Sequence, residues 1–305
     1  MRILIVGAGA TGGAFGARLQ DAGRDVTYLV RPRRAEVLRR DGLRFVSPTT
    51  DRTYRVQTLV SGEEAQPFDL VLITVKAGAL ESAVSDVRSY VSPGTLIVPI
   101  LNGMAHIGLL EQEFPGQVLG GLAKIVTTLD GDAVRQMTDL TVLTIGALDR
   151  LQAVDAVADA LRVPGIRLSV SDDILGELWG KWAFIAAAGV ICCLFRGPIG
   201  RIIDAGGLDA IHAAIAETEA VSAAAGHPVS DKAHAHTLRL LAEEGSAFTS
   251  SLYRDLIAGL PTEAEHILGN LAHEARALGV PTPLLDLTLI QIRTGAPARP
   301  GSPSE

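Results

Sequence analysis

The glycine-rich turn near the start of the chain constrains the fold more than any other feature. Residues 7–12 have the sequence Gly-Ala-Gly-Ala-Thr-Gly, which matches G-x-G-x-x-G. A continuous apolar run at 3–6 precedes the turn, helical spacing follows at 14–19, and a second strand pattern covers 25–30. Such a turn between a buried parallel strand and a helix is typical of a dinucleotide-binding domain. We therefore predict a parallel sheet with a dinucleotide site at its first turn; a merely structural glycine turn is the alternative.

Each position of this turn has a physical task in binding a dinucleotide. Gly7 allows the tight turn, and Gly9 has no Cβ, so a pyrophosphate can approach the backbone. Gly12 lets the helix pack close to the strand. Ala10 and Thr11 lie at the helix N-terminus, whose unpaired N–H groups favour phosphate. These five residues form the predicted phosphate site.

The residue at the end of the second strand predicts which dinucleotide binds. An enzyme that uses NAD places Asp or Glu there to bind the ribose hydroxyls. This chain has Arg31, followed by Pro32, Arg33 and Arg34. A guanidinium matches a 2′-phosphate in charge and in bidentate geometry, so Arg31 predicts NADPH as the cofactor. A solvated basic start to the next helix is the alternative.

The composition indicates a soluble protein that does not act on nucleic acid. The 305 residues are 48% hydrophobic and 20% charged, as in an ordinary globular protein of two domains. The net charge is −7, and no basic cluster is evident beyond the one at Arg31. The cysteines, Cys192 and Cys193, are adjacent, which suits neither a disulfide framework nor a metal site. We expect a cytoplasmic protein.

Neither a membrane segment nor a metal site is expected. The longest charge-free apolar run, 182–195, is shorter than the ~20 residues that span a bilayer, so it predicts a buried core helix. His234 and His236 would lie on different sides of a helix. We expect a small-molecule substrate, no nucleic-acid or membrane partner, and a homodimer.

Polar residues follow two further strand patterns. The apolar run 69–75 is followed by Lys76, and the run 95–100 is followed shortly by Asn102. Ligands of open α/β sheets bind at the carboxyl ends of the strands, so both side chains should lie at the same edge as the glycine turn. Loop residues without a binding role are the alternative.

The pattern changes from strands to helices near residue 170, which indicates an α/β fold class with two domains. We predict a dinucleotide-binding domain at 1–170, an all-helical domain at 171–294, and a disordered Gly/Pro/Ser-rich tail at 295–305. The second domain should begin with one long helix from Asp172, capped by Ser171 or Asp172.

Two groups in the helical domain are candidates for chemistry. Lys181 is one of four lysines and stands between Trp179 and Trp182, where an apolar surface would lower its pKa and suit it to act as an acid. Ser251 precedes Glu263, which should lie in the first turn of a helix at 262–278. Lys181 can equally be a surface lysine on a core helix. Glu263 can equally be a helix-start residue.

Taken together, these residues resemble ketopantoate reductase (2-dehydropantoate 2-reductase) along nearly the whole chain. Five motifs carry the resemblance: GAGATGG at 7–13, VKA at 75–77, LNG at 101–103, ELWGK at 177–181, and SS at 250–251 with TE at 262–263. The resemblance implies a Rossmann-type N-terminal domain followed by an all-helical C-terminal domain.

The resemblance also implies roles for individual residues. Lys181 would act on the substrate carbonyl, and Lys76 and Asn102 would line the space shared by cofactor and substrate. Ser251 and Glu263 would hold the substrate. The chain departs from the family where better-known members have asparagines four and eight residues after the lysine, since it has Ile185 and Gly189 there. Ile185 should border the substrate, and the pocket wall on that side should be apolar and roomy.

The predicted function is NADPH-dependent reduction of 2-dehydropantoate to pantoate, in pantothenate and coenzyme A biosynthesis. Reduction of another 2-oxo acid is the closest alternative, because Ile185 cannot donate a hydrogen bond. A β-hydroxyacid dehydrogenase would be expected to have asparagine at that position. A non-catalytic NADPH sensor is the alternative of a different class, and the presence of Lys181 and Glu263 argues against it.

Overall fold

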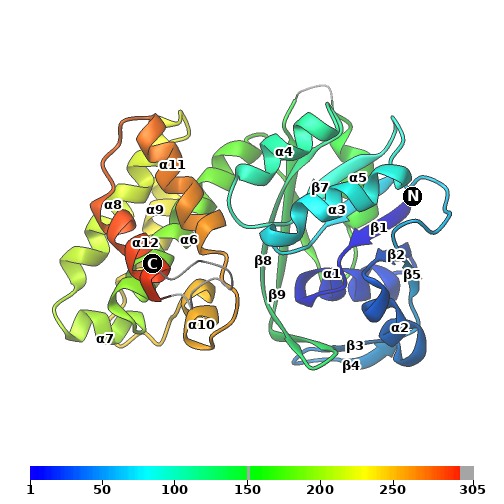
Figure 1. The fold of residues 1–305 in the computed structure, drawn as a ribbon, viewed down its shortest axis with the longest axis horizontal. Coiled ribbons are helices and arrows are strands. Elements are labelled where there is room, and N and C mark those ends of the chain that lie inside the picture. Colours follow the sequence, from blue (N-terminus) through cyan, green and yellow to red (C-terminus); the bar gives the residue numbers. More distant parts are fainter. Residues whose placement is uncertain (150–151, 296–305) are drawn as a thin grey trace, which may run out of the picture. The chain divides into compact units, whose positions relative to one another are not determined.

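The computed structural model describes residues 1–149 and 152–295, which divide into two compact units (Figure 1). The first unit is Met1–Leu178 and the second is Trp179–Glu305. The predicted tail at 295–305 lies outside the described residues except for Gly295.

A parallel five-stranded sheet forms the centre of the first unit. Its strands have the order β5-β2-β1-β6-β7, and every neighbouring pair is parallel. The bounds are β1 (Arg2–Val6), β2 (Asp25–Leu29), β5 (Gln57–Leu59), β6 (Leu70–Ile73) and β7 (Leu96–Pro99). The strand patterns at residues 3–6, 25–30, 69–75 and 95–100 thus predicted four of these strands.

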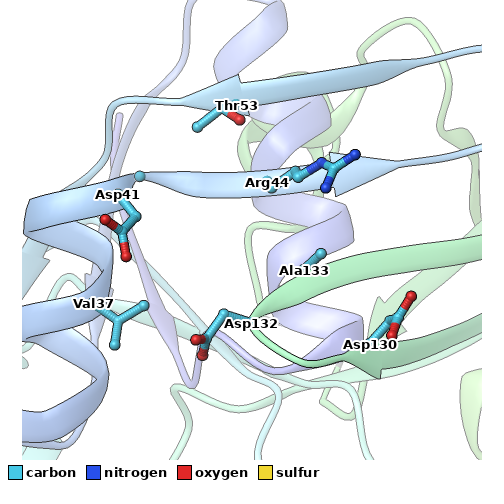
Figure 2. A pocket seen from close by; sticks show the side chains of 8 residues that line it. Val37, Asp41, Arg44, Thr53, Asp130, Asp132 and Ala133 are labelled. Atoms are coloured by element: carbon cyan, nitrogen blue, oxygen red, sulfur yellow. The ribbon is translucent and has the colours of Figure 1, made fainter.

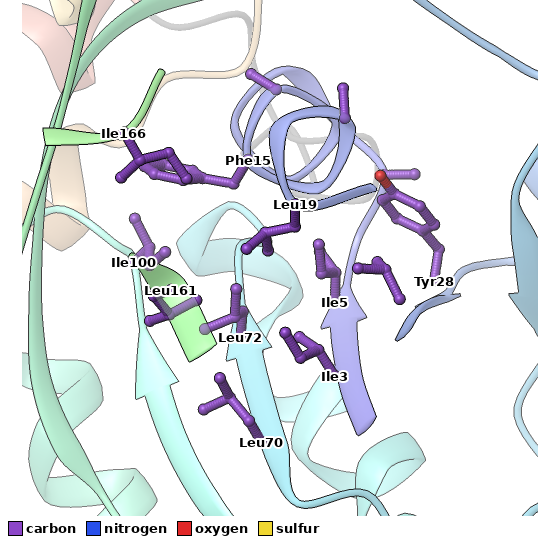
Figure 3. Packing of buried hydrophobic residues seen from close by; sticks show 14 of the residues in the cluster. Ile3, Ile5, Phe15, Leu19, Tyr28, Leu70, Leu72, Ile100, Leu161 and Ile166 are labelled. Atoms are coloured by element: carbon purple, nitrogen blue, oxygen red, sulfur yellow. The ribbon is translucent and has the colours of Figure 1, made fainter. Parts of the chain in front are cut away.

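Helices cover both faces of this sheet, which explains the continuous apolar runs of β1, β6 and β7. Ile3 and Ile5 face α1 (Ala10–Asp21) and α5 (Val154–Leu161). Leu4 and Val6 face α3 (Leu80–Val87) and α4 (Ala105–Glu113) on the other side. Figure 3 shows Phe15 and Leu19 of α1 packed in the first of these two cores.

A second sheet of mixed direction completes the first unit. It has the order β10-β9-β3-β4, with β8 antiparallel to β9. Its strands are β3 (Leu43–Val46), β4 (Asp51–Tyr54), β8 (Leu119–Asp130), β9 (Ala133–Ala147) and β10 (Arg167–Val170). The remaining short elements are α2 (Pro32–Asp41), η1 (Ala77–Ala79) and η2 (Arg88–Tyr90).

Every secondary-structure element among the described residues of the second unit is a helix. Its elements are the greater part of α6 (Ile174–Phe195), then α7 (Ile199–Asp204), α8 (Leu208–Ala224), α9 (Asp231–Leu241), α10 (Ser251–Ile257), the π-helix η3 (Glu265–Gly269), α11 (Asn270–Ala277) and α12 (Pro283–Gly295). The helix predicted at 262–278 is therefore a π-helical turn followed by α11.

The start of α6 differs from its prediction. The Asp173 carboxylate accepts a hydrogen bond from the Gly176 N–H at 3.0 Å, so Asp173 provides the side-chain cap, rather than Ser171 or Asp172. The Ser171 hydroxyl instead accepts from the Asp173 N–H at 3.1 Å. The helix accordingly begins two residues later than predicted, at Ile174.

Among the described residues, α6 is the one helix long and apolar enough to cross a membrane by length and composition. Of its most apolar window, 67% is buried inside the protein. That burial is what a core helix shows, since its apolar side chains are already covered by protein.

Candidate active site

The glycine turn after β1 has the geometry that close approach of a ligand requires. Gly7 has φ +97°, a conformation that other residues rarely adopt. A Cβ on Gly12 would lie 2.1 Å from the Gly7 carbonyl oxygen and 2.3 Å from Thr74 Oγ1, so only glycine fits there. A Cβ on Gly9 would meet no atom within 4 Å, which leaves that side of the turn open. The turn is thus tight toward the protein and open where phosphate would approach.

The N-terminus of α1 presents backbone donors at this open side. Gly13 is the first residue whose N–H bonds within the helix, to the Gly9 carbonyl at 2.9 Å. The N–H groups of Ala10, Thr11 and Gly12 therefore have no acceptor in the helix ladder. Gly9 caps the helix without a side chain, and the first turn has no acidic residue. These donors, with the positive end of the helix dipole, fit a pyrophosphate.

The other predicted cofactor residues lie along the same edge of the sheet. Arg31 follows β2 and is exposed, Lys76 follows β6 and is exposed, and Asn102 follows β7 and is half-buried. Along this edge, the strand order gives the spatial order Arg31, glycine turn, Lys76, Asn102. Three strand spacings of about 4.8 Å separate β2 from β7, so the row extends over roughly 14 Å. An extended dinucleotide can follow such an edge.

Arg34 is a residue of this edge whose contacts the sequence did not reveal. Its Nη2 donates to the Ala8 carbonyl at 3.3 Å, and its Nη1 donates to Asp132 Oδ1 at 2.9 Å. Asp132 lies in the turn between β8 and β9, 98 residues further along the chain. The basic cluster after β2 was visible in the sequence, but nothing local to it indicates this partner.

In the second unit, the predicted catalytic lysine lies on the partly exposed face of α6. Lys181, Phe184 and Ile185 are half-buried, whereas Trp182 and Ala183 between them are buried. Positions separated by three and four residues share one helix face, so these three side chains emerge together. Phe184 also lies 6.2 Å from Phe248, between ring centroids. On α6, the residues one turn after Lys181, Phe184 and Ile185, are apolar, whereas Glu177, one turn before it, is charged and exposed.

The paired serines before α10 have different environments. Ser250 is buried and caps the helix, since its hydroxyl accepts from the Tyr253 N–H at 3.1 Å. Ser251 is exposed in the first helical turn. The cap explains why a serine stands at 250, and it leaves Ser251 as the serine suited to a ligand.

Glu263 lies just before a helix rather than in its first turn, which corrects the prediction. The first helical residue is Ala264, and the Glu263 carbonyl accepts from the Ile267 N–H at 2.9 Å. The Glu263 side chain is half-buried. Glu263 therefore does not occupy the favourable position in the first helical turn that the sequence predicted.

Gly189 does not leave open space beside α6, contrary to the prediction of a roomy wall there. A Cβ at this position would lie 3.2 Å from Leu252 Cδ2 and 3.4 Å from Leu268 Cδ2. The absent side chain is thus replaced by leucines of α10 and the π-helix. The same contacts bring the Lys181 helix together with the segments that follow Ser251 and Glu263.

A pocket of about 320 Å³ lies in the first unit between α2, β3, β4 and the β8–β9 turn, and the Arg34 partner Asp132 is among the residues that line it. Figure 2 shows that Asp41, Arg44, Asp130 and Asp132 surround it. These side chains form ion pairs with neighbouring residues, and no residue of the predicted site lines the pocket. Across residues 1–149 and 152–295, no group of three His, Cys, Asp or Glu side chains could hold a metal ion.

Comparisons with known proteins agree with this geometry. Two family models match, "Ketopantoate reductase PanE/ApbA" over residues 3–150 and its C-terminal counterpart over 173–295. An uncharacterized oxidoreductase of Bacillus subtilis, YkpB, is 32% identical over 291 residues, covering 94% of this chain and 96% of its own.

Two solved structures are among those that match. The PanE/ApbA family ketopantoate reductase from Ralstonia eutropha has a TM-score of 0.87 at 25% identity, covering 97% of this chain and 98% of its own. A D-mandelate dehydrogenase in ternary complex with NADH and anilino(oxo)acetate has the same TM-score at 22% identity and the same coverage. At 22% identity, the match to the D-mandelate dehydrogenase shows a shared fold only.

Proposed function

The chain belongs to the PanE/ApbA ketopantoate reductase family of oxidoreductases, and we propose that it reduces 2-dehydropantoate to pantoate with NADPH. This reaction would place it in pantothenate and coenzyme A biosynthesis. The observation that carries the proposal is the half-buried Lys181, on a helix packed against the segments that follow Ser251 and Glu263.

The chain's own residues supply everything but the hydride, which a bound nicotinamide would provide. Gly9 and the first turn of α1 bind the pyrophosphate, and Arg31 binds the 2′-phosphate. The Lys181 ammonium stabilises the negative charge that develops on the keto oxygen and donates a proton to it. Ser251 and Glu263 hydrogen-bond the substrate. Lys76 and Asn102 position the two reactants.

Reduction of a more apolar 2-oxo acid is the second candidate, and one observation favours it. The face of α6 that carries Lys181 also carries Phe184 and Ile185, neither of which can hydrogen-bond a substrate hydroxyl. A hydroxylated substrate such as 2-dehydropantoate would then depend on Ser251 and Glu263 for its polar contacts. A substrate with a branched or aromatic side chain would gain contact area instead.

A panel of 2-oxo acids, assayed by the loss of NADPH absorbance, tests both candidates. We expect measurable kcat/KM for 2-dehydropantoate, and the Ile185→Asn variant should improve it relative to apolar analogues by a few kcal/mol at most, the scale of one buried hydrogen bond. Gly189→Asn is the contrasting variant, since Leu252 and Leu268 occupy that space and the change should destabilise the protein instead.

Turnover of none of the acids would favour the non-catalytic NADPH sensor. An unchanged ranking in Ile185→Asn would show that Ile185 does not line the substrate site. The cytoplasmic homodimer remains a prediction, which cell fractionation and sedimentation velocity test.

A further inference from the structure

Arg34 connects two segments that are far apart in the sequence. Its guanidinium contacts the Ala8 carbonyl in the glycine turn, 26 residues earlier, and Asp132 in the β8–β9 turn, 98 residues later. Nη2 also donates to the Asp132 carbonyl at 3.2 Å. The Arg34 side chain is 20% exposed, whereas that of Asp132 is 71% exposed. Arg34 is thus held in one orientation against the turn.

In this fold the adenosine end of a dinucleotide binds beside the glycine turn, and the Arg34 guanidinium contacts that turn at Ala8. Ala8 belongs to the glycine turn, along which the pyrophosphate and the adjoining ribose run in this fold. Arg31, at the end of β2, marks the position of the ribose 2′ substituent. Arg34 lies in the first turn of α2, three residues after Arg31, and its guanidinium reaches back to the Ala8 carbonyl of the glycine turn.

The contacts that hold Arg34 leave part of its donor capacity available. A guanidinium has five N–H donors in a rigid fork. Among the described residues, Asp132 and Ala8 accept from Nη1 and Nη2, and no acceptor contacts Nε. Nε–H and a remaining Nη1–H can therefore donate to a further anion. A phosphate, with several acceptor oxygens, is the group that such a fork binds best.

We propose that Arg34 is a specificity residue for the 2′-phosphate of the dinucleotide, and that Asp132 positions it. Because Asp132 is 71% exposed, the ion pair contributes little to stability, and its consequence is the orientation of the Arg34 guanidinium. Asp132 acts through Arg34 and touches no ligand itself. The proposal rests on the proposed use of NADPH, and it adds residues that neither the glycine motif nor Arg31 indicates.

Binding of 2′,5′-ADP and of 5′-AMP, measured by calorimetry, tests the proposal without any turnover. Arg34→Ala should weaken 2′,5′-ADP by about 10- to 100-fold, the scale of charge-assisted hydrogen bonds, and leave 5′-AMP nearly unchanged. Arg33→Ala is the matched control, because Arg33 is an exposed arginine in the same helix turn. It should change neither affinity, and thermal melts should show that all variants are folded.

Asp132→Ala tests the positioning role through a double-mutant cycle. Alone, it should weaken 2′,5′-ADP by less than Arg34→Ala does; in the Arg34→Ala background it should have no further effect. An additive effect would overturn the positioning role. The specificity role would be overturned if Arg34→Ala weakened both nucleotides equally or weakened neither. It would also be overturned if the unsubstituted protein did not bind 2′,5′-ADP. Failure to reduce any 2-oxo acid would contradict the proposed reaction but leave this result intact.

Discussion

At the scale of single residues, the Tyr28 hydroxyl is a buried polar group whose lack of a hydrogen bond has a clear structural cause. The Tyr28 hydroxyl is completely buried and has no partner among the described residues. Figure 3 shows it beside α1, where a Cβ on Gly16 would lie 1.9 Å from its oxygen. Burial also raises the pKa of Tyr28, so the hydroxyl stays protonated. Glycine at 16 therefore makes room for a hydroxyl that gains no bond.

Two substitutions at this contact should have opposite effects. Tyr28→Phe should be neutral or stabilising, by up to about 1–3 kcal/mol, because it removes an unsatisfied buried group. Gly16→Ala should destabilise the protein by about 1–3 kcal/mol through overcrowding. Urea denaturation of both single variants and the double variant measures this. Tyr28→Phe should relieve part of the cost of Gly16→Ala, since the added Cβ would still lie 2.5 Å from Cζ of residue 28 and 2.8 Å from Ile5 Cδ1. Purely additive effects would contradict the contact.

The residues that the sequence could predict are those whose environment is local. Gly7 and Gly12 follow from the spacing of one turn, and Arg31, Lys76 and Asn102 follow from where strand patterns end. The Arg34–Asp132 pair and the filling of the space at Gly189 depend on segments far away in the chain. No spacing rule connects such segments, so these contacts required the fold.

At the scale of secondary-structure elements, a buried hydrogen bond joins α6 to the π-helix. Trp182 Nε1 donates to the Ile267 carbonyl at 2.9 Å. Ile267 in turn donates its N–H to the Glu263 carbonyl. Because Trp182 follows Lys181 directly, this bond sets where the Lys181 segment lies against the segment of Glu263. π-Helical turns are frequent at functional sites, where they re-aim side chains.

Trp182→Phe removes this bond while it keeps an aromatic ring. We expect the free energy of unfolding to fall by about 1–3 kcal/mol, because the Ile267 carbonyl loses its buried indole donor. Trp179→Phe is the control for loss of ring volume. Trp179 packs on Trp182 at 5.0 Å and on His227 at 5.8 Å, between ring centroids, and no hydrogen bond of its indole is present among the described residues. A loss of stability that is equal in both variants would show that ring volume, rather than the hydrogen bond, matters at Trp182.

Long, strongly patterned elements were predictable, whereas short ones and helix irregularities were not. Three of the four predicted parallel strands, β1, β6 and β7, and the helix α6 have long apolar runs. In contrast, α7 and α10 are too short to show a period, and the π-helix inserts its extra residue without disturbing the apolar spacing of 262–278. The Glu263 prediction was wrong because the helix begins at Ala264, two residues later than the start at Thr262 that it assumed.

At the scale of the whole molecule, the two units divide inside α6 rather than at its start. The sequence pattern changes near residue 170, but the contact boundary falls between Leu178 and Trp179. Ile174 and Leu178 explain the difference, since both pack with Leu122 in a core cluster of the first unit. A change of composition marks where helices begin, whereas the boundary between units follows packing. Lys181 thus lies in the second unit, three residues beyond the boundary.

The central claim is that Lys181 stabilises the negative charge on a 2-oxo acid during reduction by NADPH. The most direct measurement is kcat/KM for 2-dehydropantoate with Lys181→Ala, together with the Kd for NADPH. We predict a fall of about 10²-fold or more in kcat, the usual loss when a group that stabilises the transition state is removed, with the NADPH affinity unchanged. Near-normal turnover by this variant would contradict the claim and would make Lys181 a surface residue of a core helix.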